Sequence, residues 1–135
     1  SLSTSKSIVL EQGEFEKLNV YADIDMFKTV LRHFLSNAIK FSNQGSKIIV
    51  SIKRQENYAR VSVRDFGCGI SPEDQEKLFH ASTHFSKYGT NNEEGSGLGL
   101  LLCQDFAIKN GGNIYLESTL GEGSTFSVTI PLIKE

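Results

Sequence analysis

The sequence has little cysteine and no excess of charge of either sign, and both features narrow what the protein can be. Cys68 and Cys103 are too few for a disulfide framework, and no Cys/His pair has metal-ligand spacing. We expect two structural thiols in a reducing, cytoplasmic compartment. With 14 basic and 16 acidic residues the net charge is −2, which attracts neither nucleic acid nor an anionic membrane surface.

Long apolar runs are also missing. No stretch is long enough to cross a bilayer, and no signal peptide opens the chain, so we do not expect this domain to enter a membrane. A membrane-bound parent protein is still compatible with both observations. The 135 residues, 39% of them hydrophobic, suffice for a single domain over residues 1–135 with one core.

The clearest periodic pattern predicts a helix over residues 24–41, with Asp23 as its N-cap. His33, Asn37 and Lys40 lie four and three residues apart and therefore share one stripe of that helix. Such a stripe is usually solvated. An amide among apolar neighbours nevertheless needs polar partners, which a ligand or a metal can supply.

Alternating apolar residues predict two hairpins, one from residues 48–53 and 59–65 and the other from 114–118 and 126–130. The alternation places Asp65 on the core side of its strand. A carboxylate facing a core is costly unless it is hydrogen-bonded, so Asp65 is a candidate site residue, with capping of the following turn as the alternative. Near the N-terminus we expect a short strand at 8–10 and a second extended piece over 15–22.

Two glycine-rich stretches follow. Gly67 and Gly69 come directly after the candidate aspartate, and residues 95–100 lead into a helix expected over 98–109. A helix N-terminus offers unpaired N–H groups and a positive dipole end, which suit a phosphate; a flexible linker is the alternative. Ser71 and Pro72 open a further helix that runs to about Phe79.

The stretch from 80 to 94 has little periodicity, which indicates either a lid over the site or a loop without function. Helices interleaved with hairpins indicate the α+β class. We expect a two-layer sandwich, in which about three helices cover one face of a mixed, mostly antiparallel sheet.

With these motifs in place, the chain resembles the catalytic ATP-binding domain of two-component sensor histidine kinases, in the GHKL superfamily. The resemblance covers residues 20–131. Residues 37–42 (NAIKFS) are similar to the N box, 65–70 (DFGCGI) to the DxGxGI box, 78–79 to the start of the F box and 95–100 (GSGLGL) to the GxGLGL box. Each glycine run alone is a weak signal, whereas four motifs in this order are specific.

The resemblance implies a Bergerat-type ATP-binding fold with a flexible lid, and ATP and Mg²⁺ as its ligands. It implies that Asn37 binds Mg²⁺, that Lys40 approaches the phosphates and that Asp65 accepts the adenine amino hydrogen. Ser124 resembles a residue of the strand that lines the adenine pocket. The other implied nucleotide-binding residues are Gly67, Gly69, Ile70, Phe79, Gly95, Gly97, Leu98, Gly99, Leu100 and Thr125.

Two positions depart from the family pattern. His33 stands where the family commonly has Asn, and where related ATPases have a Glu that activates water, so we do not expect efficient ATP hydrolysis. His84 stands where the lid usually has Arg or Lys, and Lys87 is the nearby alternative for contacting the γ-phosphate. With Asn37 and Lys40, these residues complete the set of candidate catalytic side chains.

None of the three histidines lies in a phosphoacceptor pattern. The resemblance therefore implies phosphoryl transfer from ATP to a histidine on the protein's own upstream dimerisation helices, in a full-length homodimer, with a response regulator receiver domain as the next partner. Two alternatives stay open. One is a serine kinase of the anti-sigma type, and the other is a noncatalytic nucleotide-binding scaffold, which the departures at His33 and His84 favour.

Overall fold

The computed structural model of the chain describes residues 7–78, 86–88, 94–96 and 98–133. The strands are β1 (Val9–Phe15), β2 (Lys47–Gln55), β3 (Tyr58–Asp65), β4 (Ser86–Tyr88), β5 (Glu94–Ser96), β6 (Asn113–Thr119) and β7 (Gly123–Pro131). The helices are α2 (Ile24–Phe41), α3 (Pro72–Leu78) and α4 (Leu98–Lys109).

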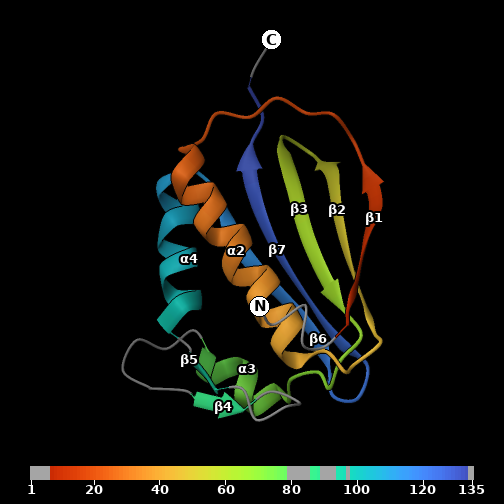
Figure 1. Ribbon diagram of the computed structural model, residues 1–135. Coiled ribbons are helices and arrows are strands. Elements are labelled where there is room, and N and C mark those ends of the chain that lie inside the picture. The colour runs from red at the N-terminus through yellow and green to blue at the C-terminus, as the bar shows by residue number, and fades with distance from the viewer. Residues whose placement is uncertain (1–6, 79–85, 89–93, 97, 134–135) are drawn as a thin grey trace.

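Five strands form one mixed sheet in the order β1-β2-β3-β7-β6 (Figure 1). Only β1 and β2 are parallel; the other neighbours in this sheet pair antiparallel. Strands β4 and β5 pair antiparallel in a separate two-stranded sheet; β4 lies in the stretch 80–94 predicted as a lid, and β5 begins at the last residue of that stretch. The predicted α+β class, with a mostly antiparallel sheet and three helices, is confirmed.

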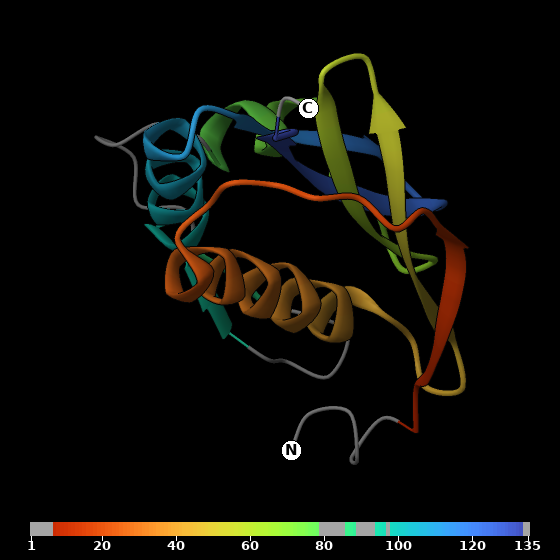
Figure 2. The ribbon, with the colours of Figure 1, turned by 90° about the horizontal axis from the view of Figure 1, so that it is seen from above.

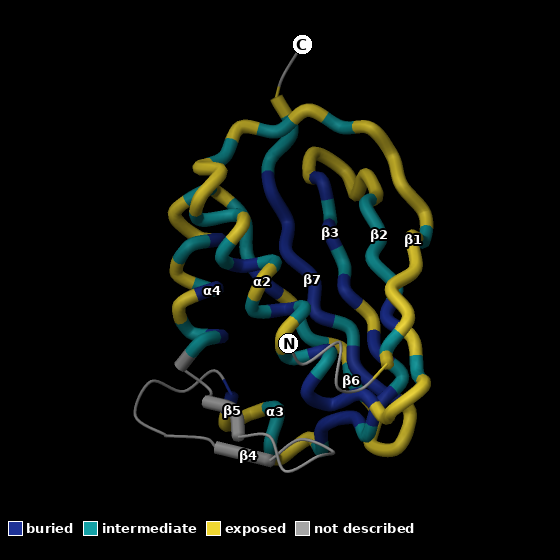
Figure 3. Tube along the Cα trace, viewed as in Figure 1, coloured by how far each residue is buried: buried dark blue, intermediate teal, exposed yellow. Residues whose placement is uncertain are grey.

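The core lies between the sheet and the two long helices. Seen from above, the sheet curls around α2, which packs on β3 and β7, while α4 packs on β6 and β7 (Figure 2). Most of β7 and alternate residues of β3 are buried, and these are the strands against which α2 packs (Figure 3). Phe34 of α2 and Phe126 of β7 are 0% and 1% exposed, and their ring centroids lie 5.5 Å apart. These two side chains join the layers at their centre.

The start of α2 is fixed by a cap and by the end of α4. The carboxylate of Asp23 accepts hydrogen bonds from the N–H groups of Asp25 and Met26, which confirms the predicted N-cap. Asn110, just after α4, accepts a bond of 2.8 Å from the Asp23 N–H through its side-chain oxygen, and its amide group donates to the Phe106 carbonyl. The two helices are thereby tied together at one end.

The N-terminal segment differs from the prediction. A single strand, β1, replaces the two predicted pieces, and residues 16–22 then cross to α2 with one isolated bridge, between Val20 and Leu132. The register of β1 on β2 shifts between Gln12 and Phe15. A shift of this kind breaks the period-2 alternation on which the prediction depended. Helix α3 is described over Pro72–Leu78, and its predicted end at about Phe79 lies outside the described residues.

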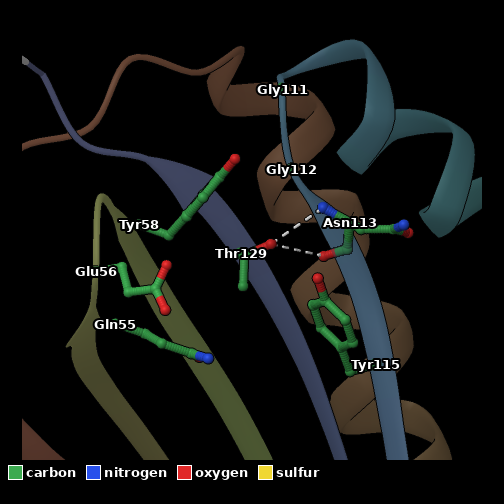
Figure 4. A pocket seen from close by; sticks show the side chains of 8 residues that line it. All are labelled: Gln55, Glu56, Tyr58, Gly111, Gly112, Asn113, Tyr115 and Thr129. Carbon is green, nitrogen blue, oxygen red and sulfur yellow. Dashed lines mark hydrogen bonds between the residues drawn. The ribbon is translucent and has the colours of Figure 1, made fainter.

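The face of the sheet away from the helices holds a small polar pocket of about 260 Å³ between the β2–β3 turn and the segment joining α4 to β6 (Figure 4). Gly112 crosses β7 so closely that a Cβ there would lie 1.6 Å from the Thr129 carbonyl oxygen. Thr129 in turn hydrogen-bonds the backbone N–H and C=O of Asn113. Tyr58, which lines this pocket, is the first residue of β3, so the pocket lies at the opposite end of that strand from Asp65.

We predict that Phe34→Ala lowers the free energy of unfolding by about 3–5 kcal/mol, because it leaves a cavity against Phe126 at the centre of the core. Urea denaturation followed by circular dichroism measures the change. Tyr21→Ala is the matched control, because its side chain is 85% exposed, and it should change stability by less than about 0.5 kcal/mol. Equal losses in both variants would contradict the assignment of the core.

Candidate functional site

Asp65 is the last residue of β3 and faces the helices, as the alternation predicted; its side chain is 1% exposed. Its Oδ1 accepts hydrogen bonds from the backbone N–H groups of Gly67, at 3.0 Å, and Ser124, at 3.2 Å. Its Oδ2 is equally buried, and no hydrogen-bond donor of the described residues reaches it. Burial raises the pKa of Asp65 from 3.8 to about 6, although the two N–H groups act in the opposite direction.

The loop after Asp65 is held by close backbone contacts. A Cβ on Gly67 would lie 1.8 Å from the Phe41 carbonyl oxygen, so only glycine fits there. The Cys68 N–H donates to that same carbonyl at 3.2 Å, and the Cys68 carbonyl accepts from the Gly121 N–H at 2.8 Å. The loop therefore lies between the end of α2 and the β6–β7 turn.

Two further glycines allow equally close backbone contacts around this loop. Gly69 has a φ of +71°, and a Cβ there would lie 2.2 Å from the Thr119 carbonyl oxygen. A Cβ on Gly123 would lie 2.3 Å from the carbonyl oxygen of Asp65. The family resemblance named Gly67 and Gly69 among the implied nucleotide-binding residues. In the structure these glycines serve, in the first place, the close approach of the protein's own backbone.

A serine pair adjoins the aspartate. The hydroxyl of Ser118 donates to the Gly123 carbonyl at 2.9 Å and accepts from the Ile70 N–H at 2.8 Å. Its proton is thereby used, so Ser124 is the donor in the 2.8 Å contact between the two hydroxyls. Ser124, whose N–H binds Asp65, thus keeps only acceptor lone pairs for anything else nearby.

No motif in the sequence marks Ser118, although one signal was present. It follows Ile114 and Leu116 on the inward face of β6, so the alternation that placed Asp65 on the core side places Ser118 there as well. In both β3 and β6, a polar residue that ends a series of inward-facing apolar residues marks a side chain of the candidate site.

Thr125 does not reach this site. The pairing of β3 with β7 puts it opposite Arg64, on the face of the sheet away from the helices. Neighbouring residues of a strand point to opposite faces, and Ser124 takes the inward position. Of the two residues named from the sequence, Ser124 therefore lies beside Asp65 and Thr125 does not, and a role in nucleotide binding stays a prediction.

The polar stripe of α2 is largely removed from solvent. His33 and Asn37 are half-buried, and Lys40 is 9% exposed, with its ammonium 5.1 Å from the ring centroid of Phe41. The interpretation as a solvated stripe is therefore wrong. His33 also meets the first turn of α4, where a Cβ on Gly99 would lie 2.8 Å from the imidazole Nδ1. The stripe thus connects the end of α2 near the Asp65 loop with the start of α4.

Several predicted residues are placed only in part. Gly95 and Lys87 pair with each other in the β4–β5 hairpin, and Leu98 begins α4. Leu100 is 2% exposed in the core, and Ile70 likewise. Phe79, His84 and Gly97 lie outside the described residues.

The two cysteines are free thiols. Cys103 is fully buried, and its burial raises the pKa of the thiol to about 12, which fits the predicted structural role. In the part of the chain that the structure describes, no three His, Cys, Asp or Glu side chains are grouped so as to hold a metal ion. The cysteines and acidic residues described here therefore form no metal centre of that kind.

Comparison with known proteins identifies the family. Residues 22–134 match the family model of the histidine kinase-, DNA gyrase B- and HSP90-like ATPases. The chain belongs to this ATPase family. The ATPase domain is 37% identical over 135 residues to the adaptive-response sensory kinase SasA of Crocosphaera subtropica, a match that covers 98% of this chain and 35% of that protein. It is also 37% identical to the sensor protein EvgS of Escherichia coli, covering 98% of this chain and 11% of EvgS.

Solved structures agree with this assignment. The catalytic domain of histidine kinase ThkA superposes with a TM-score of 0.78 at 30% identity, covering 96% of this chain and 82% of that one. The mycobacterial sensor histidine kinase MprB, at 22% identity and a TM-score of 0.80 over 99% of this chain and 89% of that one, has the same fold. The ATPase domain therefore corresponds to the ATP-binding domain of sensor histidine kinases and spans about a third or less of the two curated relatives. None of its described helices is both long and apolar enough to cross a bilayer.

We predict that the stability of the ligand-free domain depends on the protonation of Asp65. Because its pKa is raised in the folded state, the native chain holds this proton more tightly than the unfolded chain does, and the stability gained below pH 4 is lost as the pH rises through 6. Relative to Asp65→Asn, the wild-type free energy of unfolding should fall by about 2–3 kcal/mol between pH 4 and pH 7. Urea denaturation at a series of pH values measures this difference, and parallel pH profiles would contradict it.

Proposed function

We propose that this domain binds ATP with the adenine amino group against Asp65 and passes the γ-phosphoryl group to a histidine on a separate dimerisation domain. One observation carries the proposal: the buried Oδ2 of Asp65, which no described donor reaches. A buried acceptor without a partner costs about 1–3 kcal/mol, so it favours a ligand that brings an N–H donor.

The base end of the site is built to accept hydrogen bonds. Asp65 offers Oδ2 as an acceptor. Ser124 offers only lone pairs, because its hydroxyl already donates its hydrogen bond to Ser118. Adenine carries an amino group at C6, whereas guanine carries a carbonyl there. A base-binding region lined by hydrogen-bond acceptors therefore favours adenine over guanine, whose carbonyl oxygen would face the carboxylate.

The phosphate end lies between α2 and α4. The first N–H groups of α4 lack helical partners and suit a phosphate. Lys40 on α2 brings a positive charge to the same stripe as Asn37. The amide oxygen of Asn37 is a hard ligand of the kind that Mg²⁺ accepts, with phosphate oxygens and water completing its shell, so one protein ligand suffices. When bound, Mg²⁺ neutralises charge on the phosphates.

Transfer then depends on position and charge. The chain's own residues hold the nucleotide at both ends, and the acceptor histidine comes from the upstream helices in a cytoplasmic homodimer, with a response regulator as the later recipient. His33 lacks the carboxylate with which a general base takes a proton from water in related ATPases. This favours transfer to a protein over hydrolysis.

We predict that Asp65→Asn reverses the base preference. The amide keeps an oxygen for the N–H groups of Gly67 and Ser124 and turns its amino group toward the base, where it opposes the adenine amino group and suits the carbonyl of inosine. The ratio of ATP to ITP affinity should fall about tenfold or more. Isothermal titration calorimetry of the purified domain with each nucleotide measures this ratio.

The matched control is Asp105→Asn on α4, whose exposed carboxylate pairs with Lys109. It should leave both affinities unchanged. An unaltered ATP to ITP ratio in the Asp65 variant would remove Asp65 from base recognition.

We predict that Asn37→Ala abolishes the gain in ATP affinity that Mg²⁺ gives to the wild type, because the metal loses its protein ligand. Titrations with and without Mg²⁺ measure this gain, and labelled γ-phosphate incorporation in the protein that also carries the dimerisation helices should be lost in parallel. Ser36→Ala, at an exposed neighbouring position, serves as the control. A magnesium effect of wild-type size in Asn37→Ala would contradict the metal role.

A further inference from the structure

Gly99 has no backbone reason to be glycine. It is the second residue of α4, and its φ lies outside the left-handed region that favours glycine. Glycine within a helix costs about 0.5–1 kcal/mol relative to alanine. The reason for its presence must therefore be the space around it.

That space is filled by His33. A Cβ on Gly99 would lie 2.8 Å from both Nδ1 and Cε1 of the imidazole and 3.6 Å from Nε2. The first two distances are well below van der Waals contact. Helix α2 cannot give way, because Val30 and Phe34 beside His33 are 2% and 0% exposed in the core. The imidazole thus occupies the notch that the missing side chain leaves.

Among the described residues the imidazole makes no polar contact, because neither of its nitrogens has a hydrogen-bond or ion-pair partner there. Its contact with α4 therefore consists of steric packing against Gly99. It lies at the turn whose N–H groups have no partner within the helix.

We propose that His33 is a positioning residue that sets the start of α4 against α2 through Gly99, and so fixes where the first N–H groups of α4 meet the phosphates. The inference rests on the proposed function and names a regulating contact of the same site. It gives Gly99 a role distinct from making room for a phosphate. If Gly99 only made room for a phosphate, a Cβ at position 99 would weaken binding whether or not His33 is present.

A double-mutant cycle separates these roles. In Gly99→Ala either α4 or the His33 ring must move, and in His33→Ala the notch is empty, so each variant loses the same contact. We expect each to lower ATP affinity about tenfold, and the combined variant to be no weaker than either alone. Affinity for adenosine, which has no phosphates, should stay at the wild-type value in all three, because Asp65 and Ser124 are untouched.

Calorimetry supplies the affinities, thermal unfolding checks that each variant is folded, and Arg32→Ala, at the exposed position beside His33, is the control that should bind like the wild type. Losses that multiply to about a hundredfold in the combined variant would overturn the inference, as would an equal loss for adenosine. Failure of the unmodified domain to bind ATP would instead overturn the proposed function, and this inference with it. Binding by the wild type with unaffected single variants would overturn the inference alone.

Discussion

The site depends on backbone segments that pack against one another without side chains between them. Gly67 lies against the carbonyl of Phe41, and Gly123 lies against that of Asp65. A methyl group at either position would occupy the place of a backbone oxygen, and backbone cannot swing aside as a side chain can. This packing joins the end of α2, the end of β3 and the β6–β7 turn, and it orients the Asp65 carboxylate.

The cost of that arrangement falls on the carboxylate. Two N–H groups satisfy Oδ1, and Oδ2 is left buried without a described donor, with the raised pKa as the consequence. The large core around Phe34 and Phe126 offsets this cost. An acceptor that is already desolvated and fixed loses little further entropy when a donor arrives, which favours the adenine binding proposed above.

The sequence predicted most of the architecture, because the helix of α2 and both hairpins have strong, regular apolar periods. It also predicted that Asp65 faces the core. It predicted only the start of β1, at residues 8–10, because the register shift near Gly13 breaks the alternation locally. Nor did it separate Ser124 from Thr125, since both are small hydroxyl residues and only the pairing with β3 decides which one points inward. The contact between His33 and Gly99 joins residues 66 positions apart, and no local pattern encodes it.

The hydrogen bonds of Asn110 have a mechanical consequence. They tie α4 to α2 and to the Asp23 cap at the end of the helices that lies far from the Asp65 loop. At the other end, Leu100 in the first turn of α4 is 2% exposed within the core, and the His33 imidazole lies against Gly99. Helix α4 is therefore fastened differently at its two ends, by polar bonds at Asn110 and by apolar packing and steric fit at its start.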